Sequence, residues 1–239
     1  MTHYSPAKLE WRDGQPYASA FQDVYFSSDN GLLETDYVFL QGNALQSRWQ
    51  TLKTLHFTIA ETGFGTGLNF LSVVKLWLEV APATAMLHYI STEKHPLSLQ
   101  DLTSALELWP TLAEFSHHLL TNYEKLLQGN QALDLFQNRV RLSLLVGDAT
   151  TQLRQIHEAV DAWFLDGFSP AKNPDMWQTE LFQQMARLSA VGSTFATFTS
   201  AGHVRRNLAA AGFNTQKRAG FGKKREMLQG ILMSKADAR

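Results

Sequence analysis

The chain has 239 residues, 44% of them hydrophobic, so it can bury a full core, and its length suits a single domain over residues 1–239. It has no cysteine, which excludes disulfides, thiolate metal sites and a cysteine nucleophile, and its eight histidines show no metal-ligand spacing, so we expect no metal. No apolar run is as long as a membrane span, and the N-terminus lacks a secretory-signal profile, so we expect a cytoplasmic protein that does not enter a membrane.

The order of apolar runs predicts an α/β fold. Residues 1–53 form a mixed, turn-rich lead-in, which we expect to cover one end of the sheet built by residues 54–239. Helical spacing predicts a helix at 68–81 and a helical insertion at about 96–130. Alternating strands and helices predict a mostly parallel sheet with helices on both faces. Strands are expected at 55–61, 86–93, 140–149, 161–167 and 194–200, followed by a C-terminal antiparallel hairpin of 212–218 and 225–233.

Glycines follow the first predicted strand in the pattern ETGFGTG, which begins at Glu61 and contains Gly63, Gly65 and Gly67. Glycine permits positive φ and lets a cofactor approach the backbone closely. A dinucleotide fingerprint needs a further glycine three residues beyond Gly65, where this chain has Leu68. The pattern therefore favours a loop that binds S-adenosylmethionine, which has no pyrophosphate, and the alternative is a plain strand-to-helix turn.

Acidic residues end the next two predicted strands. Glu93 can accept hydrogen bonds from ribose hydroxyls, and Asp148 can accept one from an adenine amino group. Each acid alone is as well explained as a helix cap, but together they outline a nucleoside pocket at the carboxyl edge of the sheet. Asn69, Lys94 and Ala149 lie beside these motifs and complete the predicted cofactor site.

Asp166 ends the fourth predicted strand, where we expect it to face the reacting methyl group. The alternative is a carboxylate that only stabilises its loop. The loop continues through Phe168, Pro170, Pro174 and Trp177, and such a stiff aromatic segment suits stacking on a flat base. Packing beneath a lid is the competing interpretation.

Residues 205–225 hold seven positive charges and no acid, so the remainder of the chain carries a formal charge of −8 behind a net charge of −1. This asymmetry indicates a polyanionic partner, with a solvated charged face as the alternative. The basic residues are Arg205, Arg206, Lys217, Arg218, Lys223, Lys224 and Arg225.

Several long segments together resemble the methyltransferase domain of the bacterial tRNA-modifying MnmC family and its stand-alone MnmD relatives. They are residues 23–43, 61–71, 161–177, 195–208 and 220–230, and the resemblance is weakest at 96–138. It implies a Rossmann-like, S-adenosylmethionine-dependent enzyme that methylates the exocyclic amine of 5-aminomethyl-2-thiouridine at the tRNA wobble position. The product would be 5-methylaminomethyl-2-thiouridine.

The resemblance also implies roles for individual residues. Gly63, Gly65 and Gly67 become the cofactor loop, Glu93 the ribose ligand, Asp148 the adenine ligand, Asp166 the active-site carboxylate and Phe168 a flank of the target base. In full-length MnmC an FAD-dependent oxidoreductase domain follows the methyltransferase domain. This chain ends at Arg239 without a second glycine fingerprint, so it is either a stand-alone enzyme or a fragment cut at the domain junction.

Two alternatives remain open. One is another enzyme of the same fold, such as an aminopropyltransferase or a small-molecule methyltransferase, which would not need the basic segment. The other is a tRNA-binding module without catalysis, for which the intact acids Glu93, Asp148 and Asp166 would have no use.

Overall fold

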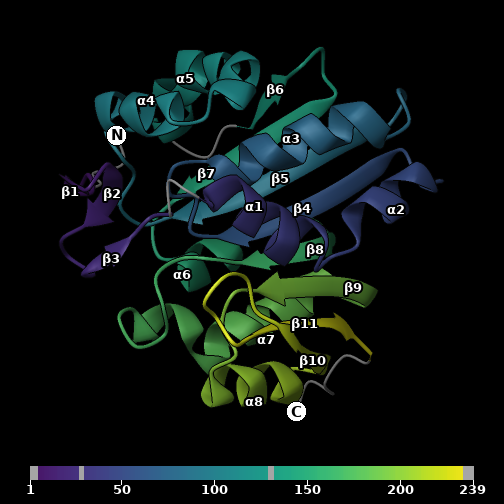
Figure 1. Ribbon diagram of the computed structural model, residues 1–239. Helices are drawn as coiled ribbons and strands as arrows, with labels where there is room; N and C mark the ends of the chain where they lie inside the picture. Colours follow the sequence, from purple (N-terminus) through teal and green to yellow (C-terminus); the bar gives the residue numbers. More distant parts are fainter. Residues whose placement is uncertain (1–4, 27–29, 129–131, 234–239) are drawn as a thin grey trace.

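The centre of the molecule is an eight-stranded sheet in the order β10-β11-β9-β8-β4-β5-β7-β6 (Figure 1). This computed structural model describes residues 5–26, 30–128 and 132–233. Neighbouring strands from β9 to β7 pair in parallel, and the remaining pairs are antiparallel. The strands are β4 (His56–Thr62), β5 (Met86–Glu93), β6 (Leu133–Leu135), β7 (Val140–Val146), β8 (Val160–Leu165), β9 (Ser189–Thr197), β10 (Phe213–Ala219) and β11 (Glu226–Leu232).

The expected mostly parallel sheet with a C-terminal antiparallel hairpin is confirmed. The third predicted strand is shorter than the expected 140–149. It ends at Val146 because Gly147 has a φ of +142°, and Asp148 already caps the next helix.

Helices cover both faces of the sheet (Figure 1). Successive side chains of a strand point to opposite faces, so Phe164 packs in one buried cluster and its neighbour Trp163 in another. The first face carries α1 (Gly31–Thr35), the π-helix η1 (Asp36–Leu40), α2 (Leu45–Gln50), α3 (Leu68–Val80), α4 (Leu99–Glu107), the 3-10 helix η2 (Pro110–Leu112) and α5 (Ala113–Leu127). The second carries α6 (Ala149–Leu153), the 3-10 helix η3 (Pro174–Trp177), α7 (Thr179–Leu188) and α8 (Gly202–Ala210).

A small antiparallel sheet near the N-terminus was not predicted. It consists of β1 (Leu9–Arg12), β2 (Gln15–Ala18) and β3 (Asp23–Val24), whose strands are too short to show a period-2 pattern. Figure 1 places it at one end of the large sheet, whereas the rest of the predicted lead-in, from α1 to α2, packs on the first face of that sheet. Within the described part of the chain, no helix has both the length and the apolar character needed to cross a membrane.

Candidate functional site

A cavity of about 830 Å³ opens at the carboxyl ends of the parallel strands. Its volume lies within the range of small-molecule and cofactor sites, and its position is where open α/β sheets bind ligands. Predicted site residues on its wall are Gly63, Gly65, Asn69, Glu93, Lys94, Asp148, Ala149, Asp166, Phe168 and Lys224. Predicted residues that do not line it are Glu61, Gly67, Arg205, Arg206, Lys217, Arg218, Lys223 and Arg225.

The glycine loop forms a cradle between β4 and β8. Gly63 has a φ of +87°, and a Cβ atom built on it would lie 3.2 Å from the Cα atom of Gly167, so a larger residue would push the two loops apart. Gly67 caps the N-terminus of α3 with a φ of +72°, and no side chain caps this helix end. The loop therefore presents bare backbone to the cavity, which suits close approach of a cofactor.

Glu93 is held rigidly at the end of β5. The backbone N–H of Gly65 donates to its Oε2 at 2.9 Å, and the backbone N–H of His95 donates to its Oε1 at 2.8 Å. Each carboxylate oxygen has two lone pairs, so each can still accept another hydrogen bond. Glu93 is therefore positioned to accept from a ligand's hydroxyl groups.

Asp148 serves as the helix cap that the sequence left as an alternative. Its Oδ1 accepts from the backbone N–H and from the hydroxyl of Thr151, both at 3.1 Å. These bonds use Oδ1, and the residue is exposed on the cavity wall. Capping α6 fixes the carboxylate in place and leaves Oδ2 to meet a ligand.

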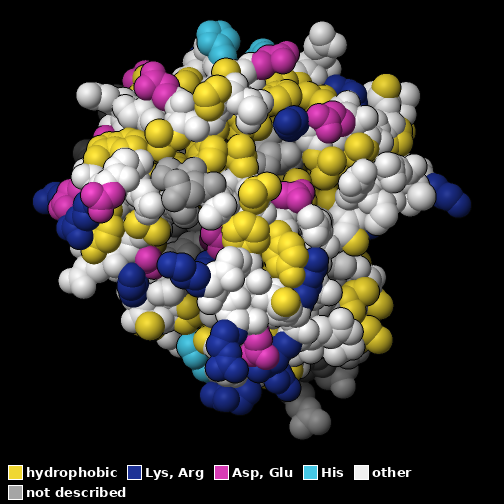
Figure 2. Space-filling model, in the orientation of Figure 1, with side chains coloured by type: hydrophobic (Ala, Val, Ile, Leu, Met, Phe, Trp, Pro, Cys, Tyr) yellow, Lys and Arg dark blue, Asp and Glu magenta, His cyan; other side chains and the backbone are white. Residues whose placement is uncertain are grey.

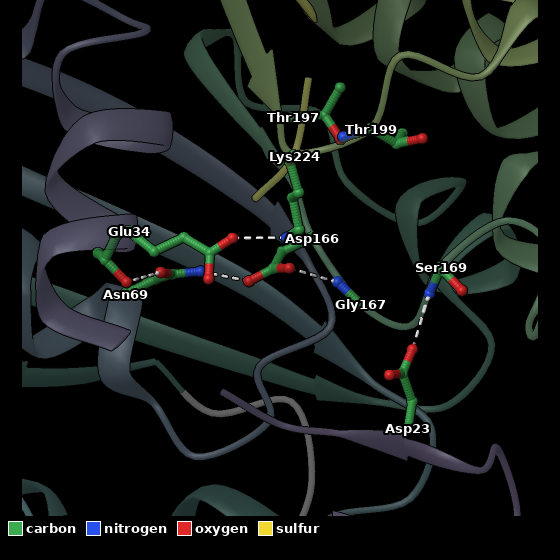
Figure 3. Close-up of polar contacts among 10 residues, drawn as sticks. Asp23, Glu34, Asn69, Asp166, Gly167, Ser169, Thr197, Thr199 and Lys224 are labelled. Atoms are coloured by element: carbon green, nitrogen blue, oxygen red, sulfur yellow. Dashed lines mark hydrogen bonds and ion pairs between the residues drawn. The ribbon is translucent and has the colours of Figure 1, made fainter. Parts of the chain in front are cut away.

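Asn69 on the cavity wall connects two acids, Glu61 and Asp166, and Figure 3 shows its bond to Asp166. Its Nδ2 donates to Glu61 Oε1 at 2.9 Å and to Asp166 Oδ2 at 2.6 Å. The hydroxyl of Thr35 donates to Asn69 Oδ1 at 2.8 Å, which orients the amide nitrogen towards both acids. Glu61 is only 1% exposed and also accepts from Ser91 at 2.7 Å, so it lies behind the wall and reaches the cavity through Asn69.

The two acids differ in charge at neutral pH. Burial, and secondarily the charge of Asp166, raises the pKa of Glu61 to about 8. Burial also raises the pKa of Asp166 to about 6, although hydrogen bonds from Gly167 and Asn69 oppose this shift. Glu61 is thus mostly protonated at pH 7, whereas Asp166 is mostly ionised. A cavity carboxylate with a pKa near neutrality is well matched to accept a proton.

The basic segment divides into groups with different surroundings. Lys224 turns into the cavity, where its Nζ lies 2.5 Å from Glu34 Oε1 and 4.5 Å from the centre of the Phe198 ring. On the β10–β11 hairpin, Lys217 pairs with Glu226 at 2.6 Å, and the Arg218 guanidinium lies 4.3 Å from the Tyr37 ring centre.

The remaining members, Arg205, Arg206, Lys223 and Arg225, are exposed. Figure 2 shows Lys and Arg side chains gathered at the lower end of the drawn face, where Figure 1 places α8.

An aromatic cluster closes one side of the cavity, and the sequence analysis missed most of it. Phe21 stacks on Phe168 with ring centres 4.4 Å apart, and Tyr25 meets Phe168 edge-on at 5.4 Å. Asp23 pairs with Lys172 at 3.1 Å and fastens the N-terminal sheet to the loop after β8. Because these contacts join residues about 145 positions apart, local sequence patterns carried no signal for them.

Comparisons with known proteins agree with this geometry. Residues 110–233 match a family described as "S-adenosyl-L-methionine-dependent methyltransferase". The chain is 54% identical over 227 residues to the "tRNA 5-methylaminomethyl-2-thiouridine biosynthesis bifunctional protein MnmC" of Methylobacillus flagellatus, covering 95% of this chain and 35% of that protein. It is 53% identical over 239 residues to the protein of the same name from Chromobacterium violaceum, covering 100% of this chain and 36% of that one.

A solved structure, MNMC2 from Aquifex aeolicus, superposes with a TM-score of 0.77 at 22% sequence identity. The match covers 97% of this chain and 72% of that one, and it supports the fold. The chain spans about a third of the length of these MnmC relatives. It covers 35% of the Methylobacillus flagellatus protein and 36% of the Chromobacterium violaceum protein.

Proposed function

Because the chain belongs to a family of S-adenosyl-L-methionine-dependent methyltransferases, we propose that it methylates the exocyclic amine of 5-aminomethyl-2-thiouridine at the tRNA wobble position. The product is 5-methylaminomethyl-2-thiouridine. The observation that carries this proposal is the 54% identity to an MnmC protein across 95% of the chain.

The cavity residues fit S-adenosylmethionine. We assign Gly63 and Gly65 to the backbone cradle, Glu93 to the ribose hydroxyls and Asp148 to the adenine amino group. Lys94, Asn69 and Ala149 complete the proposed cavity wall. Glu61 and Gly67 do not line the cavity: Glu61 accepts a hydrogen bond from Asn69, and Gly67 caps α3. When bound, S-adenosylmethionine supplies an electrophilic methyl group, and the C–S bonding pair leaves with sulfur as an amine nitrogen attacks the methyl carbon.

Asp166 is assigned the role of proton acceptor. A primary alkyl amine has a pKa near that of lysine, about 10.4, so a site that uses it as a nucleophile must favour the free amine. Partial burial beside a cationic sulfonium lowers the pKa of the amine. The Asp166 carboxylate, fixed by Gly167 at 2.8 Å and Asn69 at 2.6 Å, then takes the proton that the nitrogen loses. Fixed geometry supplies a further part of the rate.

The proposed partners follow from the relatives and from the charge distribution. The MnmC relatives are named bifunctional proteins, so we propose that an FAD-dependent oxidoreductase outside this chain, on the same or a separate polypeptide, supplies the amine. We further propose that the exposed basic residues near α8 and the β10–β11 turn dock tRNA, with the activity located in the cytoplasm.

Incubating the protein with labelled S-adenosylmethionine and tRNA that lacks only the final methyl tests the proposed function. We expect label in the wobble nucleoside. Label transferred to small amines but not to tRNA would favour the small-molecule enzyme, and tRNA binding without any transfer would favour the non-catalytic module.

Glu93→Ala is expected to weaken S-adenosylmethionine binding by about 1–3 kcal/mol, since it removes hydrogen bonds to a charged group. Calorimetry with the cofactor alone measures this change. Glu114→Ala, which removes an exposed acid outside the cavity wall, is the matched control. Unchanged affinity in the Glu93 variant would remove that residue from the proposed pocket.

Replacing both Lys223 and Arg225 with alanine is expected to weaken binding of cognate and non-cognate tRNA alike, because phosphate contacts carry no sequence information. The log–log dependence of binding on salt should flatten by about 0.7–0.9 for each lost phosphate contact. Lys224 is left intact because it lines the cavity. A double variant of the exposed Lys53 and Lys75 is the control, and an equal salt slope in both variants would contradict docking at the turn.

A further inference from the structure

Lys224 places a primary alkylammonium group inside the proposed catalytic cavity. The lysine belongs to the turn between β10 and β11, and its side chain reaches Glu34 in α1, about 190 residues away in sequence. Figure 3 shows Glu34, Asn69, Asp166 and Lys224 converging on one place. The ammonium is thus held beside the carboxylate to which we assign proton transfer.

The surroundings of this ammonium form a recognisable cation site. Glu34 Oε1 accepts from Lys224 Nζ at 2.5 Å, and the Phe198 ring centre lies 4.5 Å from the same nitrogen. A carboxylate combined with an aromatic face is a common arrangement for binding alkylammonium groups. Glu34, Phe198 and Asp166 all line the same cavity.

The proposed substrate carries the same chemical group as the lysine side chain, a primary amine on an sp³ carbon. Resting on the proposed function, we propose that Glu34 and Phe198 form the subsite that first binds the aminomethyl group of the target nucleotide as its ammonium, before Asp166 takes the proton that frees the amine. Lys224 occupies this subsite in the substrate-free protein and leaves it when the substrate enters.

The exposure of the pair permits this exchange. The Lys224 side chain is 46% exposed and that of Glu34 is 24% exposed, and ion pairs at such positions contribute only about 0–1 kcal/mol. Lysine has a long flexible stem, so its head group can move to solvent or to a phosphate without a change in the backbone. Glu34 stays in place on α1 and is the better shielded partner.

The charges of Glu34 and Lys224 act directly on the Asp166 carboxylate. The negative charge of Glu34 raises the pKa of Asp166, whereas the positive charge of Lys224 lowers it. Both groups therefore act on the carboxylate that takes the proton. A substrate ammonium that replaces Lys224 would lie in the same field and within the same cavity.

The competing explanation is that the ion pair only tethers the β10–β11 turn to α1. Glu34→Gln and Lys224→Met break the same ion pair, so a tether predicts the same consequence for both. An ammonium subsite predicts different consequences, because one variant removes the site and the other removes its resident occupant.

The experiment compares tRNA carrying 5-aminomethyl-2-thiouridine with the same tRNA carrying 2-thiouridine at the wobble position, both in the presence of S-adenosylhomocysteine. We expect the wild-type protein to prefer the amine-bearing tRNA. Glu34→Gln should reduce this preference about fivefold, the factor that corresponds to an ion pair of about 1 kcal/mol at this exposure. Lys224→Met should keep or increase the preference.

Asp134→Asn is the matched carboxyl-to-amide control, because it breaks the exposed Asp134–Arg141 pair of 2.7 Å on the far edge of the sheet. Equal losses of preference in the Glu34 and Lys224 variants, or no loss in Glu34→Gln, would overturn the subsite. A wild-type protein that neither prefers nor methylates the amine-bearing tRNA would instead refute the proposed function itself.

Discussion

Replacing Asp166 with alanine is expected to cut methyl transfer at least about 100-fold, because proton acceptance and positioning of the amine are lost together. Cofactor affinity should change little, since the contacts assigned to the nucleoside lie at Glu93 and Asp148. Single-turnover rates with saturating S-adenosylmethionine and tRNA measure the effect, and calorimetry checks that the cofactor still binds.

Asp166→Asn separates the two roles of this side chain. Asparagine keeps the shape and an oxygen for the Gly167 N–H, which donates at 2.8 Å, but it cannot take a proton. The pKa of Asp166 is about 6, so the wild-type rate should show a limb that rises with pH and is centred there, and this limb should vanish in the variant. Near-normal turnover in Asp166→Asn would leave Asp166 as a positioning residue only.

Glu61→Gln is expected to change how stability depends on pH. In the folded protein the pKa of Glu61 is about 8 against an ordinary value of 4.5, because its carboxyl is buried. Between these values the folded state holds a proton that the unfolded state has lost, so the wild type loses stability as pH rises. The loss is about 1.4 kcal/mol per pH unit, and glutamine removes it.

Urea unfolding at pH 6 and pH 8 tests this expectation. From pH 6 to pH 8, the wild type should lose about 2 kcal/mol of unfolding free energy more than Glu61→Gln does. The partly buried His88 contributes equally to both proteins. A constant difference across the interval would mean that Glu61 is already ionised at pH 6.

The sequence could predict the sheet and one wall of the site because these depend on local patterns. Apolar runs located the parallel strands, and the acids Glu93, Asp148 and Asp166 do lie around one cavity. Strand ends carry such residues to a common edge whatever the remaining packing, so their spacing along the chain was informative.

The rest of the site depends on contacts between distant segments, which local patterns do not encode. Phe21 and Tyr25 lie just before and just after the two-residue strand β3, where no pattern marks them, and Glu34 lies in a five-residue helix. Lys224 illustrates the same limit. Its charge placed it in a basic segment, but only the structure shows that its side chain lines the cavity, which that of Lys223 does not.

The position of β11 between β9 and β10 has a consequence for the order in which the protein is made. The ribosome completes β10 before β11, yet β10 joins the large sheet through β11. Until residues 226–232 emerge, β9 therefore presents an unpaired edge, the kind of surface that recruits strands from other chains. We therefore expect nascent chains to be most prone to aggregation through the β9 edge until β11 has emerged and paired with it.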